Sequence, residues 1–213
     1  MTRLALIHAL AHSVAPINDA LARDWPQALR MNLLDDSLSA DLARAGTLDA
    51  AMHQRFARLA SYALDCGSDA ILFTCSAFGP CIEAVARAHP QVPVLKPNEA
   101  MVAEAAALGG RIGLVASFAP TLASMPAEFP PQLDLRTRLA EGALAALDVG
   151  EGDRHDERVA AAAQQLVEEG CTAIALAQFS LARARDAVAA RCGVPVLTTV
   201  HSAVAELRRR LGA

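Results

Sequence analysis

The chain has 213 residues, of which 54% are hydrophobic and 20% are charged, so it can bury a substantial core and disorder is not expected. Its formal net charge of −4 and the lack of a basic patch exclude a typical nucleic-acid-binding protein. The apolar runs are too short for a transmembrane helix, and the N-terminal run lacks a signal-peptide cleavage site. We therefore expect a cytoplasmic protein without membrane attachment, whose five cysteines are reduced thiols.

Apolar runs alternate with helical patterns along the whole chain. The strands expected from these runs are Leu4–Leu10, Leu29–Leu34, Ala70–Thr74, Val92–Leu95, Ile112–Ala116, Leu133–Leu139, Ala173–Ala177 and Val194–Thr198. The expected helices include Leu48–Cys66, Pro80–His89, Asn98–Leu108, Arg154–Glu169 and Leu181–Arg191. The alternation predicts a parallel, doubly wound α/β architecture, and the more polar second and sixth runs suit edge strands.

The two halves of the chain resemble each other. Residues 69–110 align with residues 172–212 with one gap at Gln91, and both copies contain a VPVL strand and a VAE helix segment. Residues 4–13 align with residues 112–121. One interpretation is a pair of α/β units with generic patterns. We prefer a duplicated pair of lobes related by a pseudo-twofold axis, with 1–96 plus 199–213 as the first lobe and 97–198 as the second.

The repeat also predicts which segments face each other. Ligands of open parallel sheets bind beyond the carboxyl ends of the strands. Two facing lobes would therefore place equivalent strand ends across one cleft. The expected pairs are His8–Ser13 with Ser117–Thr121, Thr74–Ser76 with Ala177–Phe179, and Lys96–Glu99 with Thr198–His201.

Cys75 is the candidate for chemistry, because it ends an apolar strand just before a helix that Gly79 and Pro80 open. A thiol near a helix N-terminus is expected to have a lowered pKa. Thr74, Ser76 and the following backbone amides could hold a carboxylate or an enolate oxygen. The alternative is a buried structural cysteine, which is how we interpret the other four cysteines.

The TCSAFG segment, the two-lobed repeat and an LLDDSL segment at residues 33–38 together resemble the aspartate/glutamate/hydantoin racemase superfamily. This superfamily includes amino-acid racemases, maleate isomerase and arylmalonate decarboxylase. The resemblance implies two flavodoxin-like lobes, each with a parallel sheet of about four strands flanked by helices. It also implies a small carboxylate substrate, no metal, no cofactor, and cysteine chemistry at the carbon next to a carboxylate or carbonyl.

The racemases of this superfamily use two cysteines, one on each face of the substrate. The repeat places the second position at Gln178, which cannot relay a proton as an acid or base. Three interpretations stay open. A racemase could use Cys75 with another acid/base, His8 first and His201 second. A lyase, decarboxylase or isomerase could need one thiol only. The chain could also be an inactive small-molecule sensor.

Further polar residues are expected to bind the substrate. Ser13 and Thr121 match in the repeat, Ser117 matches Ala9, and each hydroxyl could instead cap a helix. Together with Thr74, Ser76 and His201 they complete the predicted substrate-binding set. The resemblance adds a homodimer as an expectation, because racemases of this type often pair. No dinucleotide fingerprint, Walker motif or GxSxG segment is present.

Overall fold

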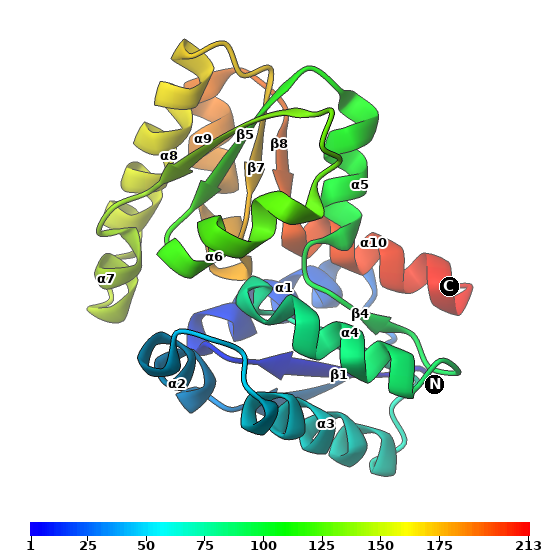
Figure 1. Cartoon of the computed structure of the whole chain (residues 1–213). Helices are drawn as coiled ribbons and strands as arrows, with labels where there is room; N and C mark the ends of the chain where they lie inside the picture. Colours follow the sequence, from blue (N-terminus) through cyan, green and yellow to red (C-terminus); the bar gives the residue numbers. More distant parts are fainter. The chain divides into compact units, whose positions relative to one another are not determined.

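The computed structural model describes all 213 residues, and the chain divides into two compact units. Unit 1 consists of Met1–Pro97 and Ala203–Ala213, and unit 2 consists of Asn98–Ser202. Each unit is a four-stranded, fully parallel sheet with helices around it (Figure 1).

Unit 1 contains the sheet order β2-β1-β3-β4. Its strands are β1 (Arg3–His8), β2 (Leu29–Leu34), β3 (Ala70–Phe73) and β4 (Val94–Leu95). Its helices are η1 (Ala11–Ser13), α1 (Val14–Asp24), α2 (Ser37–Ala45), α3 (Ala50–Asp65), η2 (Ser76–Phe78) and α4 (Gly79–Ala88), where η denotes a 3₁₀-helix.

Unit 2 repeats this topology with the order β6-β5-β7-β8. Its strands are β5 (Arg111–Ala116), β6 (Asp134–Leu139), β7 (Ala173–Leu176) and β8 (Val196–Thr198). Its helices are α5 (Glu99–Leu108), α6 (Ala119–Ser124), η3 (Met125–Glu128), α7 (Ala143–Asp148), α8 (Gly152–Glu168), η4 (Phe179–Ala184) and α9 (Arg185–Cys192). The last helix, α10 (Thr199–Leu211), begins in unit 2 and continues in unit 1.

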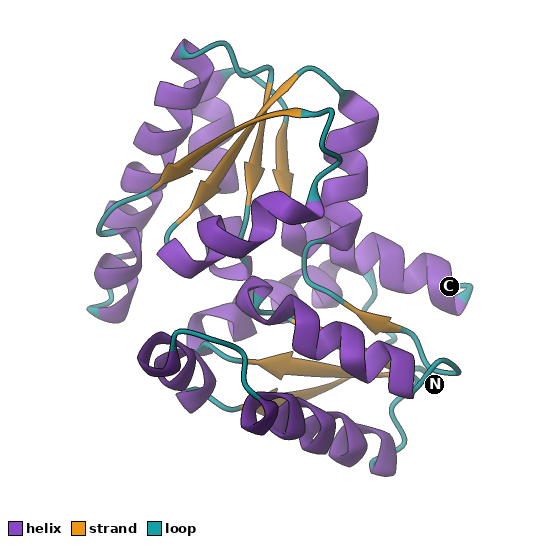
Figure 2. Ribbon diagram, in the orientation of Figure 1, coloured by secondary structure: helices purple, strands orange, loops and turns teal.

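The predicted fold class is confirmed. All eight expected strands are present, every pairing is parallel, and β2 and β6 are edge strands as their polar patterns indicated (Figure 2). The main local difference follows β7, where the expected helix from Leu181 begins as the 3₁₀-helix η4 and becomes α-helical only at Arg185. The first strand is also shorter than expected and ends at His8.

The central strands of unit 2 are apolar on both faces because helices pack against both faces of the sheet. Ile112 and Leu114 of β5 belong to a cluster with α5, whereas Val115 belongs to a cluster with α8 and α9. Gly113 faces α8 so closely that an added Cβ would lie 3.0 Å from the Leu166 Cβ atom. The missing side chain therefore lets α8 approach the sheet.

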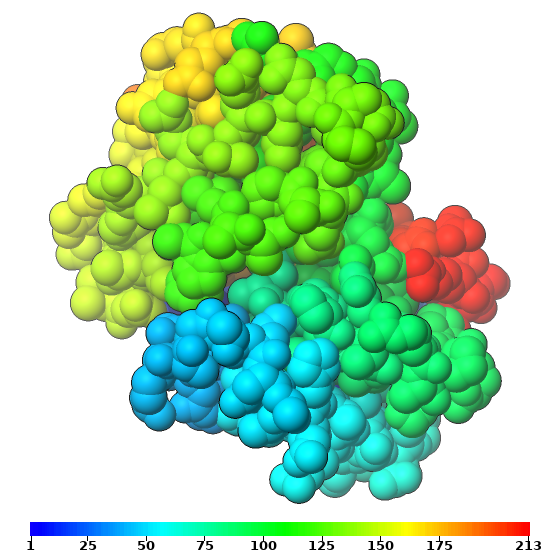
Figure 3. Space-filling view, viewed as in Figure 1, coloured from blue at the N-terminus to red at the C-terminus, as the bar shows by residue number.

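In unit 1, three aromatic rings connect helix, strand and loop. The ring of Phe56 from α3 lies 5.2 Å from that of Phe73 at the end of β3 and 5.0 Å from that of Phe78 in η2. All three rings are buried, so they fix the segment between β3 and α4. Residues of α2, α3 and α4 cover the face of unit 1 that is turned to the viewer in Figure 3.

A search of the helices for membrane-spanning segments found none with the required length and apolar character.

Candidate active site

Cys75 lies where β3 leaves the sheet of unit 1. It has an extended backbone (φ −123°, ψ 120°) and immediately precedes η2. Cys75 as a residue is partly exposed, whereas its neighbours Thr74 and Ser76 are buried. The thiol itself is shielded from solvent by the side chains around it.

The space beside the thiol has no room for a water molecule. Its lining is mostly apolar and consists of Ile7, His8, Ala9, Leu38, Phe56, Phe73 and Cys75. This poorly solvating environment raises the pKa of the Cys75 thiol from 9.0 to about 11, because burial disfavours the charged thiolate. The expected lowering of this pKa is wrong. The α-helix α4 begins only at Gly79, and a dipole effect fades within the first helical turn.

Two hydrogen-bond donors act in the opposite direction and lower the pKa of Cys75. They are the backbone N–H of Ala77 and the hydroxyl of Ser39, and their effect is smaller than that of burial. The Ser39 hydroxyl also donates to the Ala9 carbonyl oxygen at 3.0 Å. Because a hydroxyl has one hydrogen, Ser39 can accept from the Cys75 thiol in this state and can donate to a thiolate after rotating.

The pKa alone does not distinguish Cys75 from the other cysteines. Burial also raises the pKa of Cys81 to about 11, and it raises the pKa values of Cys171 and Cys192. What separates Cys75 is its geometry, because it combines a strand exit, partial exposure and two donors.

His8 lies at the end of β1 and is fully buried. Its Nδ1 atom is 2.8 Å from Thr74 Oγ1, and its Nε2 atom is 3.0 Å from Asn32 Oδ1. Burial lowers the pKa of His8, and the hydrogen bond with Asn32 offsets part of this effect. The imidazole is therefore neutral at neutral pH, with both ring nitrogens engaged inside unit 1.

Gln178 occupies the corresponding strand exit of unit 2. It follows β7, has an extended backbone (φ −136°, ψ 149°) and precedes η4, as Cys75 precedes η2. Its Oε1 atom accepts from the Ser117 backbone N–H at 2.6 Å and from the Ser117 hydroxyl at 3.2 Å. The repeat therefore brings the predicted residues Gln178 and Ser117 together, and the amide is held in one orientation.

The other predicted residues lie around these strand ends within their own units. Ser13 directly precedes α1 and Thr121 lies inside α6, and both are buried. Ser13 makes no capping hydrogen bond with its side chain. His201 lies in the first turn of α10, with its Nδ1 atom 2.6 Å from Thr198 Oγ1. Their roles in binding stay predictions, as does the expectation that equivalent strand ends share one cleft.

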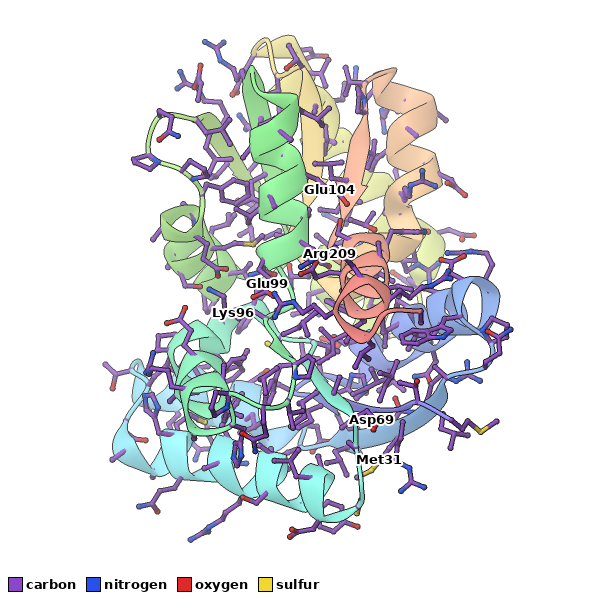
Figure 4. All side chains as sticks on the ribbon, turned by 90° about the vertical axis from the view of Figure 1, so that its right-hand side faces the viewer. Met31, Asp69, Lys96, Glu99, Glu104 and Arg209 are labelled. Atoms are coloured by element: carbon purple, nitrogen blue, oxygen red, sulfur yellow. The ribbon has the colours of Figure 1, made fainter.

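Three charged residues, of which Lys96 directly follows β4, are bound within their own units. Lys96 forms an ion pair with Glu83 at 2.8 Å. Glu104 of α5 accepts a hydrogen bond from Ser202 at 3.0 Å. Figure 4 labels Lys96 and Glu104, and it also labels Asp69, which accepts from the Arg3 backbone N–H at 2.7 Å. Lys96 is thus neutralised by a partner of its own unit.

Two residues that were not predicted from the sequence, Ser39 and Asn32, complete the surroundings of Cys75. Ser39 lies in α2, directly after the LLDDSL segment, and contacts the thiol. Asn32 is the one amide in the strand LRMNLL, and the register places it opposite Leu6, on the strand that carries His8. An amide in the strand that pairs with the His8 strand was the available signal for Asn32.

No group of three or more His, Cys, Asp or Glu side chains is arranged to hold a metal ion. That the reaction needs no metal or cofactor stays a prediction.

The fold and the strand-exit cysteine define a two-unit α/β protein, and comparisons with known proteins specify it further. The family model of the Asp/Glu/Hydantoin racemases matches residues 11–207. The chain therefore belongs to the Asp/Glu/Hydantoin racemase family, and its class is that of racemase- and isomerase-type enzymes.

Solved structures agree with this fold assignment. Glutamate racemase from Francisella tularensis, in complex with D-glutamate, has a TM-score of 0.74 and 17% identity, over 99% of this chain and 81% of that one. Allantoin racemase from Klebsiella pneumoniae has a TM-score of 0.75 and 19% identity, over 100% and 89%. A glycine-to-cysteine mutant of arylmalonate decarboxylase has a TM-score of 0.66 and 17% identity, over 99% and 94%. A search of curated proteins found no match.

Proposed function

We propose that this protein is a cofactor-independent enzyme that transfers a proton at the carbon next to a carboxylate of a small amino acid or related acid. Cys75 is the group that carries the proton. The observation behind this proposal is the Cys75 thiol at the exit of β3, which has the Ala77 N–H as a donor and the Ser39 hydroxyl as a hydrogen-bond partner that can donate to a thiolate after rotating. Both donors can stabilise a thiolate as it forms.

The proton transfer follows from these contacts. In the first step, the Cys75 thiolate removes the α-proton, so a C–H bond breaks, an S–H bond forms and negative charge moves to the substrate carboxyl or carbonyl oxygen. In the second step, the carbon takes a proton from the Cys75 S–H or from water, so the C–H bond forms again and the negative charge leaves the substrate oxygen. Hydroxyl and N–H donors near the strand end, including Thr74 and Ser76, would stabilise the charged intermediate. Such a donor typically contributes about 2.7–4 kcal/mol.

The substrate class is supported by similarity. The related structures include a glutamate racemase and an allantoin racemase, whose names point to an amino acid and to a nitrogen-containing cyclic compound. We propose a small acid of this size for the present chain. The roles of Ser13, Ser117, Thr121, Gln178 and His201 as partners of this substrate belong to the same proposal.

A lyase or decarboxylase that uses one thiol is the second candidate. The raised pKa of Cys75, about 11, keeps the thiol protonated at neutral pH, which suits a group that donates a proton to an enolate. In that reaction the C–C bond to a carboxyl group breaks, carbon dioxide leaves, and the S–H proton moves to the carbon. The thiolate then regains a proton from water. Gln178 also favours this candidate, since an amide supplies no second acid or base.

One experiment separates these candidates. The purified protein is incubated in deuterated water with aspartate, glutamate, hydantoin or phenylmalonate, while α-hydrogen exchange, optical rotation and carbon dioxide release are measured. Exchange with loss of optical activity supports the racemase, and carbon dioxide release supports the decarboxylase.

The control variants are Cys75→Ser and Cys192→Ser, the latter at the end of α9. Cys75→Ser should abolish either activity and Cys192→Ser should retain it. Full turnover by Cys75→Ser would contradict the proposed role of the thiol. Binding of a substrate with neither exchange nor carbon dioxide release would instead indicate a sensor.

A further inference from the structure

A chain of amide, imidazole and hydroxyl groups runs through unit 1 to the residue before Cys75. Asn18 of α1 and Asn32 of β2 pair through both amide groups. Asn18 Nδ2 donates to Asn32 Oδ1 at 2.8 Å, and Asn32 Nδ2 donates to Asn18 Oδ1 at 3.2 Å. Asn32 then contacts His8, and His8 contacts Thr74.

The direction of each hydrogen bond follows from this pairing. Asn18 Nδ2 also donates to the Val14 carbonyl oxygen at 2.8 Å, so its two hydrogens are used and the orientation of its amide is fixed. Asn18 in turn fixes Asn32 with Oδ1 toward His8. An amide oxygen only accepts, so His8 Nε2 must carry the hydrogen.

This assignment determines what Thr74 does. A neutral imidazole with a hydrogen on Nε2 has an unprotonated Nδ1, which accepts a hydrogen bond. The Thr74 hydroxyl therefore donates to His8 Nδ1 over 2.8 Å. The Thr74 backbone N–H donates to the Ile7 carbonyl oxygen at 3.0 Å, so both donors of Thr74 are held on β1.

We propose that Asn32 is a positioning residue for the proton transfer at Cys75, because it fixes the tautomer of His8 and thereby the orientation of Thr74. This assignment rests on the proposed function of Cys75. It also changes the expected role of His8, since an imidazole with both nitrogens engaged orients Thr74 and is not the second acid or base.

No ionised side chain is hydrogen-bonded to His8 within unit 1. The Asp35 backbone N–H donates to the His8 carbonyl oxygen at 3.0 Å, but its carboxylate pairs with Arg55 at 2.5 Å. Arg30 binds the Asn18 carbonyl oxygen at 2.9 Å. The partners of the ring are thus the neutral groups of Asn32 and Thr74.

The first test is independent of any substrate. Nitrogen-15 NMR of histidine-labelled protein at pH 7.5, with His8 assigned by the loss of its signals in His8→Gln, reports which ring nitrogen carries the hydrogen. A protonated Nε2 and an unprotonated Nδ1 are expected. The opposite tautomer, or a mixture of both, would overturn the proposal whether or not Cys75 is catalytic.

The second test changes the partner of His8. Asn32→Asp places a carboxylate beside Nε2 and should raise the His8 pKa by about 1 unit or more, measured by the same NMR titration. The matched control is Thr137→Asp, at the equivalent position of the edge strand β6 in unit 2. The control should leave the titration of His8 unchanged.

The third test is kinetic and uses whichever reaction the substrate panel reveals. Asn32→Leu should lower kcat by on the order of tenfold to a hundredfold with little change in KM, because loss of a supporting partner disturbs geometry more than binding. In Asn32→Asp the acid limb of the pH–rate profile should move to higher pH, because the His8 pKa is raised. Unchanged kcat and pH profile in both variants would overturn the positioning role and leave the function of Cys75 intact. Full turnover by Cys75→Ser would refute the proposed function and leave the tautomer result standing.

Discussion

At the exit of β3 the chain places a thiol, whereas at the equivalent exit of β7 it places an amide. The two backbones are alike, since both residues are extended and both precede a 3₁₀-helix. The surroundings differ. Cys75 is surrounded by mostly apolar side chains and is hydrogen-bonded by Ala77 and Ser39. At the other exit, the side-chain oxygen Oε1 of Gln178 accepts two hydrogen bonds from Ser117. The comparison teaches that the repeat supplies the position of a side chain, and that the residue there decides whether a proton can be transferred.

The largest difference between the two exits should appear in activity. Cys75→Ser should reduce turnover by roughly 10²–10⁴-fold, the range that a positioned acid or base contributes, with little loss of stability. Gln178→Ala should instead reduce stability by about 1–3 kcal/mol, because the Ser117 N–H loses its acceptor. Turnover assays and urea denaturation of both variants check this. An equal loss of activity in the two variants would contradict this difference between the exits.

The reactivity of the Cys75 thiol tests how far its buried surroundings raise its pKa. Because the pKa of Cys75 is raised to about 11, its thiolate is scarce at pH 8. Alkylation by iodoacetamide at this pH should therefore be about 100-fold slower than for a thiol with the ordinary pKa of 9.0. Mass spectrometry of the Cys75 peptide against a small-molecule thiol gives the rate. Faster labelling than the free thiol would show that donors outweigh burial.

A packing difference between the units should be measurable as stability. Gly113 of β5 is equivalent to Ala5 of β1, and a Cβ added at Gly113 would lie 2.8 Å from Ile174 Cδ1 and 3.0 Å from Leu166 Cβ. Gly113→Ala should therefore lower the free energy of unfolding by about 1–3 kcal/mol. Ala5→Gly, the reverse change in unit 1, should lower it by about 0.5–1 kcal/mol. Urea denaturation measures both, and a stabilised Gly113→Ala would refute the close approach.

The smallest effect is a pH dependence that belongs to unit 1. Burial lowers the pKa of His8, so the unfolded chain takes up a proton that the folded chain resists. Stability should therefore fall as pH drops below the ordinary histidine value of 6.5, by at most about 1.4 kcal/mol per pH unit. His8→Gln should remove this contribution, and His89→Gln, at the end of α4, should retain it. Thermal melts between pH 7.5 and 5 provide the measurement.

The fold was predictable because the pattern of apolar runs and the internal repeat indicated the same architecture. Apolar runs located all eight strands, and polar residues in Leu29–Leu34 and Leu133–Leu139 indicated the two edges. The repeat also aligned Gln178 with Cys75 at matching strand exits. These features depend on residues close in sequence or on a comparison of two segments, which a single sequence contains.

The environment of the thiol was not predictable in the same way. Its pKa depends on Leu38, Phe56 and Phe73, which come from three separate elements and together exclude water. Ser39 and Asn32 likewise reach Cys75 and His8 only through the packing of α2 and β2. The sequence indicates the helix that follows the thiol, but it does not indicate the 3₁₀-helix η2 between them. The predicted lowering of the Cys75 pKa by the helix N-terminus was therefore too large.

The path of α10 has a consequence for the order in which the protein is built. Unit 2 is one continuous stretch of chain, whereas unit 1 includes the final segment Ala203–Ala213, in which Arg208 donates to the Asp24 carbonyl oxygen at 2.8 Å. Synthesis therefore completes the whole of unit 2 before it adds this segment of unit 1. The half that carries Cys75 therefore closes only after a segment that is made later than the whole of unit 2.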